Sequence, residues 1–218
     1  RTCFGALDLS GKHDLTSLTL VFPDDETDPN FDILQFCWTP IEQLGARRPA
    51  EQDRFREWIA AGHIVTVPGK TVRFNFVASE LVKLAKEFDI QVIGFDRWRI
   101  DDFMVDLNDV DPNFPVPLEP FGQGFKDMSP AVEWFAELAL TGRLRHGAHP
   151  VLTAAVAGAI TESDAAGNLK IAKDKSNGRG PVRVDPAVTL VMALGLAKRF
   201  EGAPKIDIND FLMNAVAA

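Results

Sequence analysis

The sequence predicts an α/β fold built on a mixed β-sheet that is flanked by α-helices. Strand-like segments come first and are joined by short polar turns, which is typical of an antiparallel meander. Helical and strand-like segments then alternate, which indicates that further strands join the same sheet. Of the 218 residues, 46% are hydrophobic and 25% are charged, a composition that suits a globular chain with a substantial core.

Three strands are expected near the beginning of the chain, at residues 4–9, 15–22 and 31–38. The second shows the clearest alternation, with Leu18, Leu20 and Phe22 spaced two residues apart. Residues 90–95 form a nearly continuous apolar run, which predicts a central strand that is buried on both faces. Shorter strands are expected at 63–67 and 116–120, and a hairpin at 161–173.

Helical spacing of apolar residues marks the remaining elements. Ser129 and Pro130 resemble an N-cap followed by the first helical residue, so one helix is expected to begin there. Asp185 and Pro186 open the last strong helix in the same way. With no internal repeat and no linker-like tract, residues 1–218 are expected to form one domain. The six helices are expected at 51–61, 76–88, 98–107, 130–140, 150–160 and 187–200.

Charge and composition exclude several classes of protein. No apolar stretch is long enough to cross a membrane, so no membrane partner is expected. Cys3 and Cys37 lie in apolar strand-like segments and are expected to be buried reduced thiols. All four histidines, His13, His63, His146 and His149, are expected to be structural. The net charge of −8 argues against a generally basic nucleic-acid binder, although an acidic metal site with a local basic patch is compatible with it.

Three aspartates stand at the ends of predicted elements: Asp8 at the end of the first strand, Asp96 at the end of the central strand, and Asp185 at the start of the last helix. If the two strands are neighbours, Asp8 and Asp96 point into one cleft, and Asp185 can complete a cluster. Carboxylate oxygens of this kind hold Mg²⁺ or Mn²⁺, and two such ions support phosphodiester hydrolysis. The alternative is that Asp8 shapes a turn and the other two cap helices.

A basic stretch precedes Asp185, and Asp174 is its one acidic residue. Its glycines allow a ligand to approach the backbone closely, which favours contacts with DNA phosphates. The alternative is a solvated loop without a ligand. The candidate DNA-binding residues are Lys170, Lys173, Lys175, Arg179 and Arg183.

Four segments, in order along the chain, resemble the nuclease domain of the large terminase subunit of tailed bacteriophages. The first runs from Asp8-Leu9-Ser10 to Asp14-Leu15-Thr16-Ser17-Leu18, and the second is Gly94-Phe95-Asp96-Arg97-Trp98. The third runs from Gly142-Arg143 to Pro150-Val151-Leu152, and the fourth from Asp164 to Val188. Pro186 departs from the pattern, because some members of the family have glycine after the last aspartate.

This resemblance implies an RNase H-like fold and a Mg²⁺- or Mn²⁺-dependent endonuclease that uses two ions to cut double-stranded DNA during genome packaging. It assigns the catalytic and metal-binding carboxylates to Asp8, Asp96 and Asp185, with Asp14 as a weaker auxiliary ligand. It also implies the cytoplasm of the infected bacterium as location. The implied partners are an ATPase motor domain, the portal and the small terminase subunit.

The sequence has no Gly-x-x-x-x-Gly-Lys-Ser/Thr loop, so the chain is expected to be the nuclease half without the motor. Two alternatives stay open at this point. One is another RNase H-like nuclease of the resolvase or transposase type, which uses the same carboxylates on different DNA. The other is a non-catalytic RNase H-like scaffold. An actin-type ATPase is excluded because its glycine-rich phosphate loops are missing.

Overall fold

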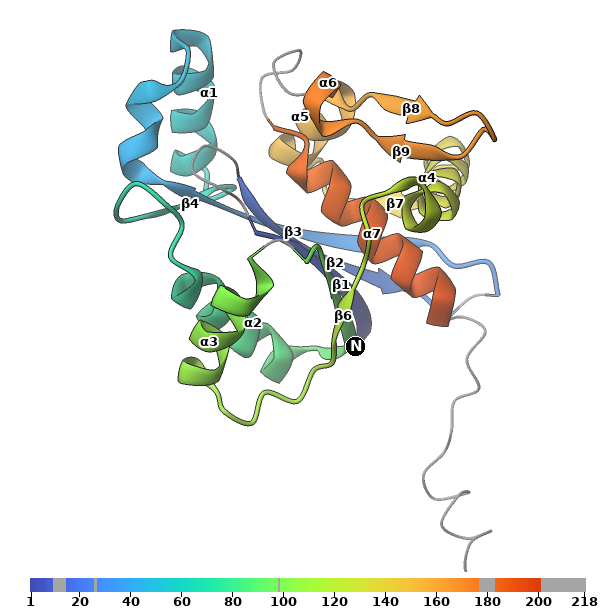
Figure 1. Ribbon diagram of the computed structural model, residues 1–218, viewed down its shortest axis with the longest axis horizontal. Helices are drawn as coiled ribbons and strands as arrows, with labels where there is room; N and C mark the ends of the chain where they lie inside the picture. Colours follow the sequence, from blue (N-terminus) through green and yellow to red (C-terminus); the bar gives the residue numbers. More distant parts are fainter. Residues whose placement is uncertain (10–14, 26, 98, 177–182, 201–218) are drawn as a thin grey trace, which may run out of the picture.

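The computed structural model describes residues 1–9, 15–25, 27–97, 99–176 and 183–200. Strands and helices alternate along the chain after an initial run of three strands, as the sequence predicts (Figure 1). The strands are β1 (Thr2–Asp8), β2 (Thr16–Pro23), β3 (Phe31–Pro40), β4 (Val65–Val67), β5 (Asp89–Phe95), β6 (Leu118–Pro120), β7 (Leu144–Arg145), β8 (Thr161–Ser163) and β9 (Leu169–Ile171). The helices are η1 (Ile41–Ala46), α1 (Pro49–Ala60), α2 (Phe74–Glu87), α3 (Ile100–Val110), α4 (Phe125–Leu140), α5 (Pro150–Gly158), α6 (Lys173–Ser176) and α7 (Asp185–Phe200).

Seven strands form one mixed sheet in the order β4-β3-β2-β1-β5-β6, and β7 also pairs with β3. Strands β1, β2 and β3 are antiparallel, whereas β5 lies parallel to β1 and β6 parallel to β5. The first three strands thus form an antiparallel meander, and β5 pairs with β1 at the edge of that meander. Strands β8 and β9 form a separate antiparallel hairpin.

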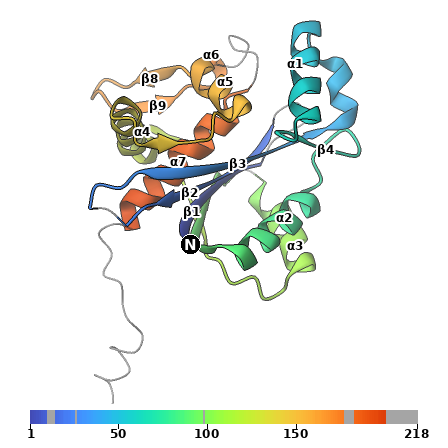
Figure 2. The same ribbon diagram turned by 180° about the vertical axis from the view of Figure 1, so that it is seen from behind.

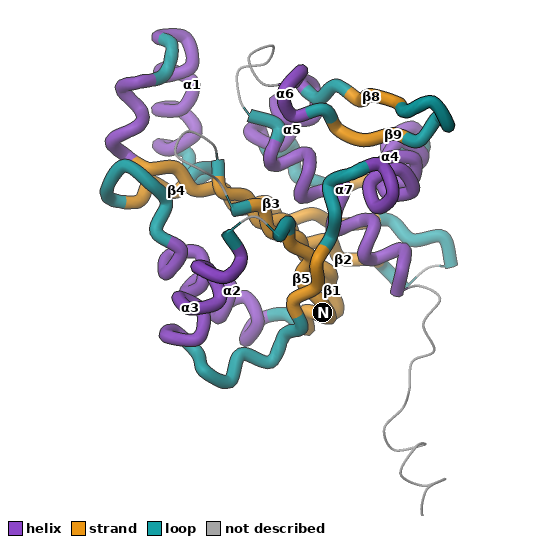
Figure 3. The backbone as a smooth tube through the Cα atoms, in the orientation of Figure 1, coloured by secondary structure: helices purple, strands orange, loops and turns teal. Residues whose placement is uncertain are grey.

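Helices cover both faces of this sheet, as Figures 1 and 2 show from opposite sides. Alternating residues of each strand point to opposite faces, so the sheet contributes to two hydrophobic cores. On one face, Val21 and Ile33 pack with residues of α4 and α7, and on the other, Leu20 and Phe22 pack with residues of α2. The tube in Figure 3 shows the strands of the seven-stranded sheet as one band between these helical layers, with the hairpin β8–β9 apart from it.

Helix α7 is buried along almost its entire length, from Asp185 to Ala197. It lies against β1 and β2 and is covered on its outer side by α4 and α5. Two glycines permit this close packing. A side chain at Gly94 of β5 would place its Cβ 2.6 Å from Leu196 of α7, and one at Gly195 would place its Cβ 2.7 Å from Ala131 of α4. The sheet and α4 thus fix the position of α7.

The expected start of α4 is wrong. The helix begins at Phe125 after Gly124, so Pro130 lies inside it and Ser129 is not its N-cap. The Ser129 hydroxyl instead accepts a hydrogen bond from the Leu169 backbone N–H of β9 at 3.0 Å. The Ser-Pro pair resembles a helix start, but this serine joins α4 to the hairpin.

Several expectations about buried residues are confirmed. Cys3 and Cys37 are buried free thiols. Trp58 and Trp134 are buried as well. Trp98 lies outside the described residues. Within the described segments, no helix is both long enough and apolar enough to cross a membrane.

Candidate metal and DNA site

Asp8 and Asp96 stand at the same end of two neighbouring parallel strands, β1 and β5. In the register of β1 with β5, Leu7 pairs with Phe95. Asp8 is the last residue of β1, and Asp96 directly follows β5. The Asp8 side chain is buried, whereas Asp96 is partly exposed. The parallel pairing therefore places the two backbone positions side by side, as expected from the sequence.

Asp185 reaches the same region from the other end of the chain. It is the first residue of α7 and is only 4% exposed. The ammonium group of Lys173, the first residue of α6, contacts Asp8 Oδ2 and lies 3.4 Å from Asp185 Oδ1. Two buried carboxylates that are distant in sequence therefore share one cationic group.

The charge of Lys173 is stabilised by these contacts. Burial alone lowers the pKa of this ammonium group, but the charges of Asp8 and Asp185, together with their hydrogen bonds, outweigh burial and raise it above its ordinary value. Lys173 is consequently protonated at neutral pH and neutralises part of the negative charge of the pair. The sequence predicts Lys173 as a contact of DNA, and nothing in it indicates that this side chain turns toward the aspartates.

Gln123 is a further residue that sequence reasoning missed. Its side-chain Nε2 lies 3.5 Å from Asp8 Oδ2 and 3.8 Å from the sulfur of Met192 on α7. It belongs to the loop between β6 and α4, where the sequence shows only the flanking Gly122 and Gly124. The residue is adjacent to the carboxylates because β6 extends the sheet beside β5.

Among the described residues, no three His, Cys, Asp or Glu side chains are gathered closely enough to bind a metal ion by themselves. Asp8 and Asp185 nevertheless have the chemistry of a cation site, since both are buried and both already surround a positive charge. Hard carboxylate oxygens suit Mg²⁺ and Mn²⁺. The residues present therefore fit such ions, with Asp96 at the adjacent strand end. Asp14 lies outside the described residues.

The predicted basic stretch is largely engaged in ion pairs. Lys170 of β9 lies 2.9 Å from Glu162 of β8, and Lys175 of α6 contacts the same carboxylate. These hydrogen bonds, first that of Lys175 and then that of Lys170, lower the pKa of Glu162. Arg183 is partly exposed beside α7, and Arg179 lies outside the described residues. Glu162 thus joins the hairpin to α6, the element that carries Lys173.

Three histidines meet near the beginning of α5. His149 is the N-cap of this helix, and its Nδ1 accepts the Leu152 N–H at 3.4 Å. Its ring lies 4.8 Å from that of His63, measured between centroids. Burial, followed by the charges of His63 and His146, lowers the pKa of His149 to about 4. This neutral capping role agrees with the expectation that the histidines are structural, and His13 lies outside the described residues.

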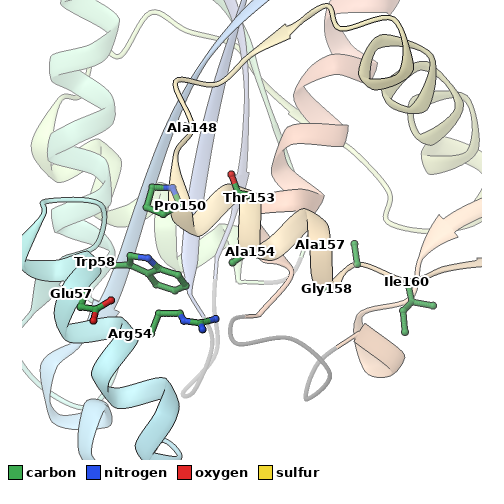
Figure 4. A pocket seen from close by; sticks show the side chains of 11 residues that line it. Arg54, Glu57, Trp58, Ala148, Pro150, Thr153, Ala154, Ala157, Gly158 and Ile160 are labelled. Atoms are coloured by element: carbon green, nitrogen blue, oxygen red, sulfur yellow. The ribbon is translucent and has the colours of Figure 1, made fainter.

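A large open pocket of about 860 Å³ lies between α1 and α5 (Figure 4). Arg54, Glu57 and Trp58 line it from α1, facing small residues of α5 such as Thr153 and Ala154. Asp8, Asp96 and Asp185 are not among its lining residues. The pocket is therefore separate from the carboxylates, and its small apolar wall offers few groups for acid–base chemistry.

Comparison with known proteins assigns the chain to a family. The family described as terminase large subunit, endonuclease domain, matches residues 1–201. The large terminase subunit of Enterobacteria phage HK97 is 37% identical over 217 residues, which cover 100% of this chain and 42% of that protein. The chain thus spans about two fifths of the length of this curated relative.

Solved structures agree with this assignment. The crystal structure of the HK97 bacteriophage large terminase matches with a TM-score of 0.80 and 39% sequence identity, covering 90% of this chain and 39% of that one. The large terminase nuclease of the thermophilic phage G20c matches with a TM-score of 0.54 and 13% identity, over 92% of this chain and 82% of that one, which shows the fold alone.

The magnesium-bound structure of that G20c nuclease matches with a TM-score of 0.50 and 12% identity, over 88% of this chain and 80% of that one. The expected RNase H-like mixed sheet flanked by helices is therefore confirmed. The chain belongs to the family of terminase large-subunit endonuclease domains.

Proposed function

We propose that this chain is a metal-dependent endonuclease that cuts double-stranded DNA during phage genome packaging. One observation carries the proposal: Asp8 and Asp185, which are far apart in sequence, are buried around a single cationic group. Burying two carboxylates together is costly unless a positive charge compensates them. An arrangement of this kind is expected where a protein binds cations, and family membership indicates which reaction they serve.

In this proposal Asp8, Asp96 and Asp185 hold two Mg²⁺ or Mn²⁺ ions, and Asp14 is an auxiliary ligand. When bound, such ions supply an activated water and stabilise the leaving oxygen of the phosphodiester. The role of the chain itself is to fix the three carboxylates at one sheet edge. Lys173 compensates their charge when no metal is present, and Gln123 restrains Asp8 through its amide. The products carry 5′-phosphate and 3′-hydroxyl ends.

Lys170, Lys173, Lys175, Arg179 and Arg183 form the proposed DNA surface. Phosphate contacts carry no sequence information, so cleavage by this chain is expected to tolerate different sequences. We also propose that residues 1–218 act as one nuclease domain, alongside an ATPase motor domain, the portal and the small terminase subunit. The proposed location is the cytoplasm of the infected bacterium.

A plasmid-cleavage assay tests this function. Supercoiled DNA is incubated with the purified chain in Mn²⁺, in Mg²⁺ and in excess EDTA. Cleavage is expected only with a divalent metal, and Asp8→Asn, Asp96→Asn and Asp185→Asn are each expected to reduce it to background. Asp109→Asn is the matched control, because it removes an exposed carboxylate on α3, and it is expected to cleave normally. Equal cleavage in EDTA would contradict the proposal.

A further inference from the structure

A buried polar network lies between the first turns of α7 and the sheet, where apolar packing would otherwise be expected. Thr189 of α7 is fully buried, and its hydroxyl lies 2.8 Å from Ser17 Oγ and 2.7 Å from Thr19 Oγ1 of β2. Gln35 of β3 lies on the other side of these two residues. Its Nε2 donates to Ser17 Oγ at 2.9 Å, and its Oε1 accepts from Thr19 at 2.8 Å.

Counting protons determines the direction of each hydrogen bond in this network. The Gln35 amide is oriented by the backbone carbonyl oxygens of Leu18 and Phe36, which accept from the same Nε2 at 3.2 and 3.1 Å. Each hydroxyl has a single proton to donate. Thr19 uses its proton on Gln35 Oε1, so at their 2.7 Å contact Thr19 accepts from Thr189, whose one proton also faces the backbone oxygens of Asp185 and Pro186 at 3.2 Å.

Ser17, which already accepts from Gln35 Nε2, therefore donates to Thr189. The four side chains form a closed ring in which each member donates one hydrogen bond to the next and accepts one from the previous. We define this set, Ser17, Thr19, Gln35 and Thr189, as the hydroxyl–amide ring.

The hydroxyl–amide ring lies one helical turn from the candidate site. Thr189 follows Asp185 by four residues, so both occupy the same side of α7. The Thr189 hydroxyl also lies 3.2 Å from the backbone oxygen of Asp185. At the sheet, Ser17 is the register partner of Asp8 on β1. The ring thus joins the backbone segments that carry both buried aspartates.

We propose that the hydroxyl–amide ring positions Asp185 relative to Asp8, and that Thr189 is a positioning residue for metal binding. This inference rests on the proposed function. Close apolar packing at Gly94 and Gly195 holds the second half of α7 against the sheet and α4, whereas near Asp185 the ring adds directional hydrogen bonds between α7 and β2. A closed ring of hydrogen bonds has one favourable geometry, and buried polar networks whose members are all satisfied are rigid.

Two substitutions at Thr189 test this inference. Thr189→Val keeps the shape of the side chain and removes the hydroxyl, which opens the ring. Thr189→Ser keeps the hydroxyl, so the ring stays closed. Mn²⁺ affinity is measured by isothermal titration calorimetry on each folded variant. Thr189→Val is expected to bind Mn²⁺ about 10- to 100-fold more weakly, the range typical for residues that orient metal ligands, and Thr189→Ser is expected to recover most of that affinity.

Val191→Ala is the matched control, because it changes a buried residue of α7 that packs in the hydrophobic core and has no side-chain group that takes part in the ring. It should lower the melting temperature without changing Mn²⁺ affinity. If Thr189→Val does not fold, Ser17→Ala opens the same ring from the sheet and gives the same comparison. Wild-type affinity in the opened-ring variant would overturn the inference. A wild-type chain that neither binds Mn²⁺ nor cleaves DNA would instead contradict the proposed function.

Discussion

At the scale of single residues, Lys173 has the most direct influence on the two buried aspartates. Its ammonium group contacts Asp8 and lies 3.4 Å from Asp185, while its own side chain is 29% exposed. The residue therefore acts as an internal counterion. A divalent ion that binds the same carboxylates competes with Lys173 for their oxygens. It carries twice the charge of the ammonium group.

Lys173→Gln is expected to destabilise the metal-free chain by about 1–3 kcal/mol. Removing one partner of a fully buried ion pair costs about 3–5 kcal/mol, and the partial exposure of Lys173 reduces that figure. Mn²⁺ should then recover much of the loss, because it replaces the missing positive charge. Chemical denaturation in EDTA and in Mn²⁺ measures both effects. Lys83→Gln, which breaks an exposed ion pair on α2, is the control, and equal stability of the two variants in EDTA would contradict this account.

His149 provides a pH-dependent prediction. Its pKa is lowered to about 4 in the folded chain, whereas an unperturbed histidine has a pKa of about 6.5. The unfolded chain therefore binds a proton first as the pH falls. The contribution of neutral His149 is complete above pH 6.5 and is lost progressively between about pH 6.5 and pH 4, with an upper limit of about 3 kcal/mol.

His149→Asn should remove this part of the acid sensitivity. Asparagine is also a good N-cap, so α5 keeps its cap while the titrating group disappears. Denaturation curves recorded every half pH unit from 7 to 4 measure the change. An unchanged slope in the variant would mean that another group controls stability in this range.

Individual residues differ in how well the sequence predicts their environment. Asp8, Asp96 and Asp185 could be singled out as candidates because each stands where a regular pattern begins or ends. The sequence does not predict that the side chains of Lys173 and Gln123 point toward the aspartates, since their direction depends on how α6 and the β6–α4 loop pack against the sheet. The hydroxyl–amide ring was also missed, because serine, threonine and glutamine in a strand or helix usually indicate a solvent-facing side.

At the scale of elements, the hairpin β8–β9 and α6 act together. Besides the Glu162 ion pairs, the Ser176 hydroxyl accepts the Ile160 N–H at 2.9 Å and donates to the Ala172 carbonyl at 2.7 Å. These contacts explain why part of the glycine-rich basic stretch forms a short helix. The sequence left open whether this stretch is a solvated loop, because a single turn of helix has no periodic pattern of its own.

The pairing by Glu162 predicts how this unit contributes to DNA binding. Lys170→Gln combined with Lys175→Gln should reduce the salt dependence of DNA affinity, by a slope of about 0.9 for each DNA phosphate that the chain no longer neutralises. Glu162→Gln should have the opposite effect and tighten binding, because both lysines lose a competing anion. Lys83→Gln, on the opposite face of the sheet, is the control.

Fluorescence anisotropy over a series of salt concentrations, recorded in Ca²⁺ or EDTA to avoid cleavage, measures these slopes. Wild-type affinity and slope in both the double variant and Glu162→Gln would place the DNA elsewhere on the chain.

The prediction of the elements from sequence was accurate where the pattern was long and periodic. Strand β5 and helix α7 lie where their apolar patterns indicate. The start of α4 was wrong because Ser129 and Pro130 have the local chemistry of a helix start. In the folded chain Ser129 lies inside α4 and contacts β9 instead. Such contacts between distant segments cannot be predicted from a local pattern.

At the scale of the whole molecule, metal binding should appear as increased stability. Mn²⁺ at about 100 times its dissociation constant is expected to stabilise the wild-type chain by about 2.7 kcal/mol. For a chain of this size, that corresponds to a rise in melting temperature of roughly 5–10 °C. Asp96→Asn and Asp185→Asn should lose most of the rise, whereas Asp109→Asn should retain it. Thermal melts with Mn²⁺ and with EDTA test this, and identical Mn²⁺ responses in all four proteins would contradict it.

In the proposed function, Asp8, Asp96 and Asp185 together bind the catalytic metal. Anomalous diffraction at the manganese edge, from crystals of the chain soaked in Mn²⁺, tests it most directly because it locates the ions themselves. Two peaks about 3.5–4 Å apart are expected, coordinated by these three carboxylates, with the Lys173 ammonium displaced from between Asp8 and Asp185. Manganese bound at another place, with the contacts of Lys173 to both aspartates intact, would contradict it.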